Sequence, residues 1–487
     1  MKIQKSTGVI IFFVIIIGAI SWNRLGSLLS PGDYHDVDHM VKTIMDKSAA
    51  PGIAMVISEQ GKLDYKCYGY GDIKSQKPVS EEALFELGST TKAFTALAVI
   101  LLEDRGDLKG SDCVSDYFPW FTPVYNGKQA DITIDQLLAH TGGIPAWSIR
   151  LIPEGTTEDM LEKTIRNISS ITLDTYPGTK YNYATVNYDV LALIIEKVTG
   201  QRYEDYIKKD ILLPLGMTES YFSTGQEKPL RNLTRGYKIF FGKNLEYEAP
   251  RYKGNIAAGY LVTNIKELGL WVNAQLGIGN IPDKLASAIK KSHEVIKETA
   301  GYEGGGKYYS YGWSNNVEDR VITHGGNNPN YSSHVIIDLE KEEAIFVLAN
   351  LSSGIPAQIA HNVYEDINGK QMRKYSYDDF YLLLDLIFSV LVIIEASNLC
   401  IKIARRKKQT VKTENPKSRS IMGIKVRLGL RIVLIIFIIV WPYFINYSYH
   451  LLWIWMSNII FVWEALAIIN GVRAIAENIK RIKVSTP

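Results

Sequence analysis

The chain has 487 residues, of which 46% are hydrophobic and 22% charged, and its formal net charge is +3. This length accommodates one large domain or two ordinary ones, and three cysteines exclude a disulfide-rich framework. The charge is unevenly distributed. Residues 402–431 contain eleven Lys or Arg and one acid, whereas residues 32–378 carry a net charge of about −9. An acidic main domain argues against nucleic acid as a partner.

The first 31 residues read as an export signal. The apolar run "GVIIFFVIIIGAISW" (8–22) follows two lysines, which is the pattern of a secretory signal peptide or a short signal anchor. Ala19 and Ser21 have the spacing of a cleavage site, so a cleaved and a retained form both remain open.

Residues 32–372 have the pattern of a mixed domain. The segment 52–72 predicts two strands around a tight glycine turn, and 89–104 and 186–199 predict helices. Three more extended runs, "YSYGWSNN", "NYSSHVIIDLE" and "EEAIFVLAN", come late in the domain. Strands at both ends with helices between them predict an α+β fold, in which one antiparallel sheet is closed by its termini and covered by helices.

Three apolar runs follow, at 380–403, 428–447 and 451–471, and each reaches the roughly 20 residues that cross a bilayer. The loop 404–427 and the tail 472–487 are basic, which predicts that both are cytoplasmic. We therefore expect a multi-pass protein of the cell membrane, with the lipid bilayer as a partner and the main domain extracytoplasmic.

Three acids lie within these runs: Asp385, Glu395 and Glu464. An acid in a membrane span is costly unless it is paired or hydrated. A functional role and interhelical hydrogen bonding, or a position near the interface, are both compatible with the sequence.

Ser89-Thr90-Thr91-Lys92 stands at the start of an apolar helical pattern. A serine there is an ordinary helix start, and a second Ser-x-x-Lys occurs at Ser287. On a helix, however, positions i and i+3 share a face, so the hydroxyl and the amine can meet. A lysine with its usual pKa of about 10.4 is protonated, and desolvation or a neighbouring cation is needed to make it a base.

Two further segments carry candidate chemistry. Tyr183 lies in an aromatic-rich loop before a helix, where a phenol can share a proton with a lysine, although most of the 29 tyrosines serve packing. His324-Gly325-Gly326 precedes a strand, and glycines there allow a substrate backbone to approach. The amide of Asn327 is placed to act with that of Ser89 as an oxyanion hole.

Other motifs are weaker. In "GYEGGGKY" (301–308) the residue after the lysine is Tyr308, not the Ser or Thr of a phosphate-binding loop. "HDVDH" (35–39) lacks a third ligand and reads as a charged helix start, and His140 reads as a packed turn residue. We expect neither a metal nor a cofactor.

Taken together, Ser89-x-x-Lys92, Tyr183-x-Thr185 and His324-Gly325-Gly326 resemble, in order and spacing, the motifs of the penicillin-recognising serine hydrolases. This family includes class C β-lactamases, D,D-carboxypeptidases, D-aminopeptidases and esterases. The likeness covers about residues 36–365 and implies a β-lactamase/transpeptidase-like fold with a helical subdomain.

The resemblance also implies roles. Ser89 would form an acyl-enzyme, Lys92 and Tyr183 would move its proton, and the amides of Ser89 and Asn327 would hold the oxyanion. Substrate contacts would come from a larger set: Thr185, His324, Gly325, Gly326, Asn328 and Asn330.

Two departures from the family's motifs concern substrate. The family usually has asparagine at the position of Thr185, where its amide holds the acyl chain, and often lysine at the position of His324, where it attracts a carboxylate. Both changes weaken the expectation of a β-lactam, or of a cell-wall peptide with a free carboxylate.

An export signal, one such domain and three spans together resemble the prodrug-activating peptidases of the colibactin and zwittermicin pathways. That resemblance implies a peptide substrate carrying a D-amino acid, from which an N-acyl-D-asparagine cap is removed. A cell-wall D,D-carboxypeptidase or penicillin-binding protein, a D-amino-acid esterase, and a β-lactam-binding sensor remain alternatives.

Overall fold

The computed structural model describes residues 32–223, 232–296, 301–375, 379–409, 421–444 and 448–485. The chain divides into two compact units. Unit 1 contains residues up to Lys238 and Asn244–Asp379, and unit 2 contains Ile239–Lys243 and the chain from Phe380 onward. The expected export signal lies outside the described residues and stays a prediction.

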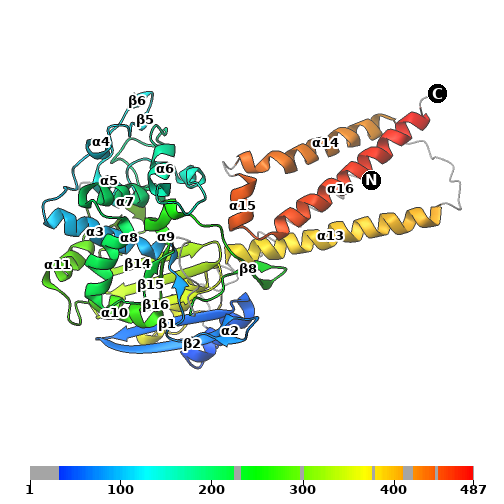
Figure 1. The fold of residues 1–487 in the computed structure, drawn as a ribbon. Coiled ribbons are helices and arrows are strands. Elements are labelled where there is room, and N and C mark those ends of the chain that lie inside the picture. The colour runs from blue at the N-terminus through cyan, green and yellow to red at the C-terminus, as the bar shows by residue number, and fades with distance from the viewer. Residues whose placement is uncertain are drawn as a thin grey trace. The chain divides into compact units, whose positions relative to one another are not determined.

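Unit 1 is built on a nine-stranded sheet whose order is β11-β12-β13-β14-β15-β16-β1-β2-β3 (Figure 1). Its strands are β1 (Gly52–Glu59), β2 (Lys62–Asp72), β3 (Lys77–Pro78), β11 (Tyr302–Gly304), β12 (Lys307–Ser310), β13 (Trp313–Asn316), β14 (Val321–Asn328), β15 (Tyr331–Asp338) and β16 (Glu343–Ala349). All neighbouring strands are antiparallel. Strand β1 pairs with β16, with Ile53 opposite Ala349, so strands from both ends of the domain meet. The predicted α+β fold with an antiparallel sheet is confirmed.

The central strand β1 is buried on both faces. Because side chains alternate along a strand, Ala54 and Val56 face one side and Ile53 and Met55 the other. All four are fully buried, but Ala54 and Val56 alone belong to the large core cluster. This explains the uninterrupted apolar sequence of β1: helices cover both faces of the sheet.

The helices of unit 1 differ in which part of the sheet they cover. In Figure 1, α3, α4, α5, α6 and α7 gather beside the sheet. Helix α10 packs on β1 and β16, and α2 packs against α12, which covers β15 and β16. The α-helices are α2 (Val37–Ser48), α3 (Lys92–Asp104), α4 (Val114–Tyr117), α5 (Ile134–Leu138), α6 (Met160–Asn167), α7 (Val186–Thr199), α8 (Tyr203–Ile207), α9 (Ile256–Gly259), α10 (Ile265–Gln275), α11 (Asp283–Ser292) and α12 (Ile355–Ile367).

Short elements complete unit 1. They are the strands β4 (Phe85–Glu86), β5 (Val124–Tyr125), β6 (Lys128–Gln129), β7 (Tyr221–Phe222), β8 (Tyr237–Phe240), β9 (Lys243–Glu246) and β10 (Leu261–Thr263), the 3-10 helices η1 (Gly88–Thr91), η2 (Ala146–Leu151), η4 (Leu213–Leu215) and η5 (Lys253–Asn255), and the π-helical turn η3 (Lys208–Leu212). Strand β10 pairs with both β4 and β7, which fixes the segment just before η1.

Unit 2 consists of α13 (Phe380–Gln409), α14 (Ile421–Phe444), α15 (Tyr449–Trp455) and α16 (Ile459–Ser485), together with the tip of the β8–β9 hairpin. The three acids expected within the apolar runs, Asp385, Glu395 and Glu464, are hydrogen-bonded. The carboxylate of Asp385 accepts hydrogen bonds from the hydroxyl of Ser457, at 2.6 Å, and from two backbone amides of the hairpin tip. Two other pairs connect helices: Glu395 with Asn470, and Glu464 with Trp441. These contacts favour the hydrogen-bonding interpretation of the acids.

Two helices of the described chain are long and apolar enough to cross a membrane, over Phe380–Ala404 and Ile459–Lys480. These two helices overlap the expected spans 380–403 and 451–471. The expected span 428–447 falls on α14 and on three residues outside the described chain. The expected span 451–471 is wrong in its bounds, because the helix breaks between α15 and α16. The Ser457 hydroxyl accepts from the amide of Ile459 and starts a new helix there.

Candidate functional site

Ser89 lies in the 3-10 turn η1, directly before the buried helix α3. The turn begins at Gly88, whose φ of +59° lies in the left-handed region. Thr90 and Thr91 are buried beneath the turn, whereas Ser89 is partly exposed. The serine hydroxyl therefore stands at the surface of a rigid turn, while the rest of the motif is held in the core.

Lys92 is fully buried, and its Nζ lies 3.0 Å from Ser89 Oγ. The amine also contacts the hydroxyl of Thr185 at 3.3 Å and donates to the carbonyl of Ala258 at 2.8 Å. These three partners are uncharged, and no carboxylate of the described residues lies within ion-pair distance of this amine. The structure thus joins the hydroxyl and the amine of the Ser-x-x-Lys motif in a dry setting. In the second copy of that motif, on α11, Ser287 and its lysine are both exposed.

Tyr183 is half-buried beside Lys92, whose Nζ lies 5.2 Å from the centre of the phenol ring. The ring packs against His140, with centroids 4.2 Å apart, and edge-on against Tyr309. Among the described residues, no hydrogen bond joins its hydroxyl to Ser89 or Lys92. The structure therefore brings the ring of Tyr183 to the amine.

Asn327 reaches the site through a close backbone approach between β14 and η1. A Cβ on Gly88 would lie 2.4 Å from the Asn327 nitrogen, and one on Gly326 would lie 2.0 Å from the carbonyl oxygen of Leu87. Only glycine permits this distance. The two glycines therefore place the amide of Asn327 against the turn that carries Ser89, which is where the sequence analysis expected the second oxyanion donor.

His324 is buried and its ring is fixed. The Nδ1 atom lies 2.7 Å from the carbonyl of Gly325, which can only accept, so Nδ1 carries the hydrogen. The Nε2 atom, 2.9 Å from the hydroxyl of Tyr309, is then the acceptor. Burial, and secondarily the charge of Lys92, lower the pKa of His324 to about 3. This side chain is neutral near pH 7 and supplies no positive charge for a substrate carboxylate.

Of the remaining residues expected to bind substrate, Gly325 is exposed along β14, and Thr185 contacts Lys92. Asn328 and Asn330 are buried, and their amides bond inside the protein. Asn328 donates to Glu86 at 2.7 Å and to the carbonyl of Gly259 at 2.9 Å. The amide of Asn330 donates to the carbonyl of Tyr247 at 2.9 Å. The amides of Asn328 and Asn330 therefore stabilise the protein around the site.

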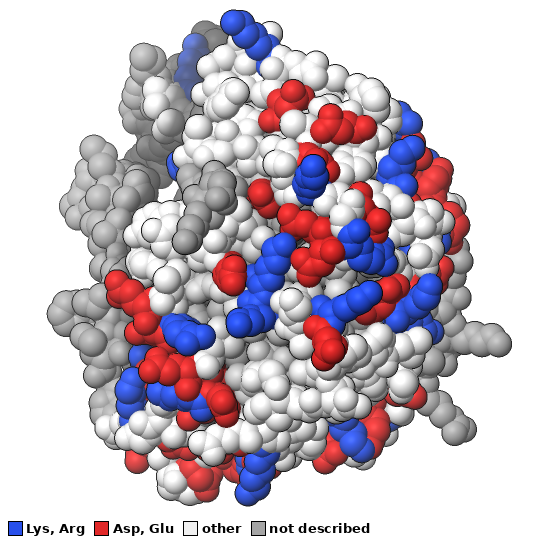
Figure 2. All heavy atoms as spheres, turned by 90° about the vertical axis from the view of Figure 1, so that its left-hand side faces the viewer, with Lys and Arg blue, Asp and Glu red and all other residues white. Residues whose placement is uncertain are grey.

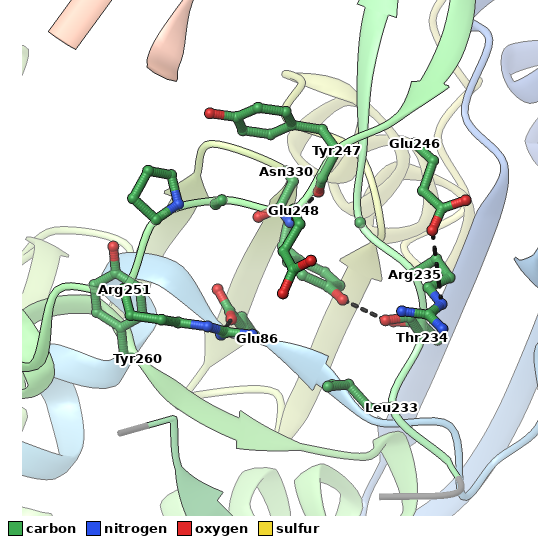
Figure 3. Close-up of a pocket in the computed structure, with 14 residues that line it drawn as sticks. Glu86, Leu233, Thr234, Arg235, Glu246, Tyr247, Glu248, Arg251, Tyr260 and Asn330 are labelled. Carbon is green, nitrogen blue, oxygen red and sulfur yellow. Dashed lines mark hydrogen bonds and ion pairs between the residues drawn. The ribbon is translucent and has the colours of Figure 1, made fainter. Parts of the chain in front are cut away.

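One of these two asparagines lines a pocket (Figure 3). This residue is Asn330. Glu86, which accepts from Asn328, also lines the pocket, and its Oε1 lies 3.1 Å from Nη1 of Arg251. The cavity measures about 80 Å³. That is far below the roughly 300–1,000 Å³ of small-molecule sites and suits a small cluster of water molecules. The pocket is too small for a peptide substrate.

Two residues near the motif were not singled out from the sequence. Asp189, one turn after Thr185 on α7, is fully buried, and neither carboxylate oxygen has a hydrogen-bond partner in the described chain. Burial raises its pKa well above the usual value, while the charge of Lys92 acts in the opposite direction. Asn255 is half-buried, with its Oδ1 3.4 Å from the hydroxyl of Thr185. No pattern in the sequence around Asn255 indicates a role in the site.

The surface around the domain carries both signs of charge. On the face in Figure 2, acidic and basic side chains are interspersed. Attraction of a charged substrate to one large patch is not indicated on this face, so substrate selection has to be argued from the side chains of the site.

Comparison with known proteins places this geometry in context. A family model described as beta-lactamase matches residues 37–367. The chain is 30% identical over 381 residues to Protein flp of Staphylococcus aureus, covering 75% of this chain and 74% of that protein. It is 27% identical over 327 residues to Penicillin-binding protein 4* of Bacillus subtilis, covering 64% and 70%. Among solved structures, the octameric penicillin-binding protein homologue from Pyrococcus abyssi aligns with a TM-score of 0.61 and 27% identity, covering 73% of this chain and 80% of that one.

Proposed function

Because the chain belongs to the beta-lactamase family of serine hydrolases, we propose that it cleaves an amide bond of a peptide through an acyl-enzyme on Ser89. One observation carries this proposal. The hydroxyl of Ser89 lies 3.0 Å from the amine of Lys92, which is fully buried and contacts uncharged partners. A general base has to lie within hydrogen-bond reach of the proton that it takes, and the amine of Lys92 meets this requirement.

In the proposed reaction, Ser89 Oγ bonds to the carbonyl carbon and its proton passes to Lys92. Tyr183, whose ring lies beside the amine, relays that proton to the leaving nitrogen as the C–N bond breaks. The backbone amides of Ser89 and Asn327 stabilise the oxyanion. Water then attacks the ester, and the serine recovers its proton as the acyl group leaves as an acid.

For the substrate, we propose an exported peptide from which an N-acyl-D-asparagine cap is removed. Neutral His324 offers no charge to a terminal carboxylate, which suits a bond inside a longer peptide. Thr185 and Asn255 offer short polar groups next to Lys92, which suit a carboxamide. Support for this substrate is chemical compatibility with the site, together with the arrangement of the chain.

We further propose that the protein is anchored in the cell membrane with its catalytic domain outside the cytoplasm. Two helices, Phe380–Ala404 and Ile459–Lys480, have sufficient length and hydropathy to span a bilayer. The basic residues of 402–431 favour a cytoplasmic position for the loop after the first of them.

A second candidate is a cell-wall D,D-carboxypeptidase, because relatives of this chain are named as penicillin-binding proteins. Such a substrate ends in a free carboxylate, which usually needs a fixed cation. The neutral state of His324 is the observation against it. A D-amino-acid esterase and a β-lactam-binding sensor would use the same acyl-enzyme and differ in turnover.

The test of the nucleophile is mass spectrometry of the full-length protein in detergent after reaction with a fluorophosphonate, which labels activated serines. We expect one adduct on the native protein and none on Ser89→Ala. The control is Ser287→Ala, which alters the exposed second copy of the motif and should label normally. A Ser89→Ala protein that is still labelled would contradict the proposal.

The test of substrate compares release of an amine from an N-acyl-D-Asn peptide and from a peptide ending in D-Ala-D-Ala. Cleavage of the first supports removal of a cap. Cleavage of the second alone establishes the D,D-carboxypeptidase instead. A burst of acyl-enzyme with a β-lactam, without turnover of either peptide, would establish the sensor.

A further inference from the structure

Asn255 stands at the end of a chain of contacts that starts at the proposed nucleophile. Lys92 Nζ lies 3.0 Å from Ser89 Oγ and 3.3 Å from Thr185 Oγ1. The same hydroxyl of Thr185 donates to Asn255 Oδ1 at 3.4 Å. Thr185 occupies the N-cap position of α7, yet its side chain does not cap that helix. The hydroxyl is instead directed to the amine on one side and to Asn255 on the other.

The amide nitrogen of Asn255 is available to a ligand. Among the described residues it has no hydrogen-bond partner, and it is not one of the buried polar atoms that lack one. The side chain is half-buried, so this NH₂ group faces accessible space beside the site. Asn328 and Asn330 differ, because their amide nitrogens are already used by acceptors inside the protein.

The backbone that carries Asn255 is firmly held. Lys253 is buried, and its amine pairs with Glu158 at 2.7 Å and with Glu204 at 3.3 Å. A Cβ on Gly254 would lie 2.1 Å from Thr164 Oγ1, so η5 packs tightly against α6. Pre-ordering of this kind reduces the entropy that a binding side chain loses when it contacts a ligand.

We propose that Asn255 is a specificity-determining residue, whose amide nitrogen donates to a carbonyl oxygen of the substrate's acyl group. The Thr185 hydroxyl orients the amide by donating to its Oδ1. The preferred substrates are then acyl groups that carry an amide carbonyl next to the scissile bond, as in an N-acyl amino acid. Thr185 is too short to supply this donor itself, so a residue on a different segment supplies it. The inference rests on the proposed serine hydrolase activity.

The experiment compares two activated esters of the same chain length on the full-length protein in detergent. The p-nitrophenyl ester of N-acetylglycine carries the amide carbonyl, and p-nitrophenyl pentanoate lacks it. A hydrogen bond between neutral groups contributes about 0.5–1.5 kcal/mol, which corresponds to a roughly 2- to 13-fold effect. We expect Asn255→Ala to lower kcat/KM for the acetylglycine ester by up to about tenfold and to leave the pentanoate within about twofold.

Two further variants separate donation from packing. Asn255→Asp keeps the size and the acceptor but loses the donor, so it should lose the same preference between the esters. Thr185→Asn in the Asn255→Ala background places an amide on the side chain that contacts residue 255. This double variant should restore part of the preference between the esters. The matched control is Asn244→Ala, which alters a half-buried asparagine whose amide bonds the carbonyl of Ala49 and should preserve the preference.

The outcomes are distinct. Equal loss on both esters in Asn255→Ala and Asn255→Asp would overturn the inference, while the proposed hydrolase function of the native protein would stand. If the native protein hydrolyses neither ester, and Ser89→Ala is still labelled by the fluorophosphonate, the proposed function fails first. If Asn255→Ala does not fold, as judged by circular dichroism, the Asn255→Asp result decides.

Discussion

The close approach between β14 and η1 predicts that Gly326→Ala disables catalysis without removing any candidate catalytic side chain. The added Cβ would lie 2.0 Å from the Leu87 carbonyl oxygen and 2.3 Å from Ser333 Oγ, both of them buried. Real Cβ atoms do not approach backbone so closely, so β14 must move away from the turn. The amide of Asn327, the next residue, moves with it. Loss of one oxyanion donor costs about 2.7–4 kcal/mol, or 100- to 1,000-fold in kcat, and overpacking destabilises by about 1–3 kcal/mol.

The assay is hydrolysis of p-nitrophenyl pentanoate, with thermal unfolding followed by circular dichroism. Gly354→Ala is the control for activity, because its Cβ meets nothing within 4 Å and its φ is −82°. Gly325→Ala, in the same strand, is the control for stability, because its nearest neighbour is His334 Nδ1 at 3.4 Å. A Gly326→Ala protein with kcat within tenfold of the native value would refute the proposed position of the oxyanion donor.

Three further predictions concern stability. The pKa of His324 is about 3 in the folded state, against about 6.5 when unfolded, so the unfolded chain binds more protons between these values and stability falls as the pH drops below about 6.5. The free energy of unfolding lost because of this ring is about 2 kcal/mol at pH 5. Urea unfolding of His324→Gln should lack this part of the pH dependence. The raised pKa of Asp189 has the opposite sign: its penalty grows as the pH rises above about 3.9, so Asp189→Leu should be more stable by about 1–3 kcal/mol at pH 7, with a smaller gain near pH 4. Equal stability of the two proteins at pH 7 would show that the carboxyl has a partner. Asp385→Ala should lower the thermal stability of the detergent-solubilised protein, because it leaves two amides of the hairpin tip and the hydroxyl of Ser457 without their acceptor, while Asp385→Asn should be milder.

The sequence was sufficient where the relevant contacts are local. Ser89 and Lys92 are three positions apart, so a helical turn can bring them together, and the distance of 3.0 Å between their side chains agrees with that spacing. The antiparallel sheet was also predictable, because strand patterns at both ends of the domain with helices between them favour one sheet closed by its termini.

Contacts set by tertiary packing could not be predicted. Asn255 meets Thr185 across 70 residues, and its sequence neighbours carry no signal of that meeting. Whether an asparagine amide faces a substrate or the protein interior depends on its neighbours in space, and for Asn328 those neighbours are Glu86 and a backbone carbonyl. The break before α16 likewise depends on Ser457 meeting Asp385, 72 residues away.

The pairing of β1 with β16 has a consequence for biogenesis. Strand β1, around Ile53, lacks this neighbour until the strand that ends at Ala349 has been synthesised. During that interval β1 is an apolar strand with both faces exposed and one edge unpaired. Such a state is prone to aggregate. Assembly of the domain is therefore expected to be slow.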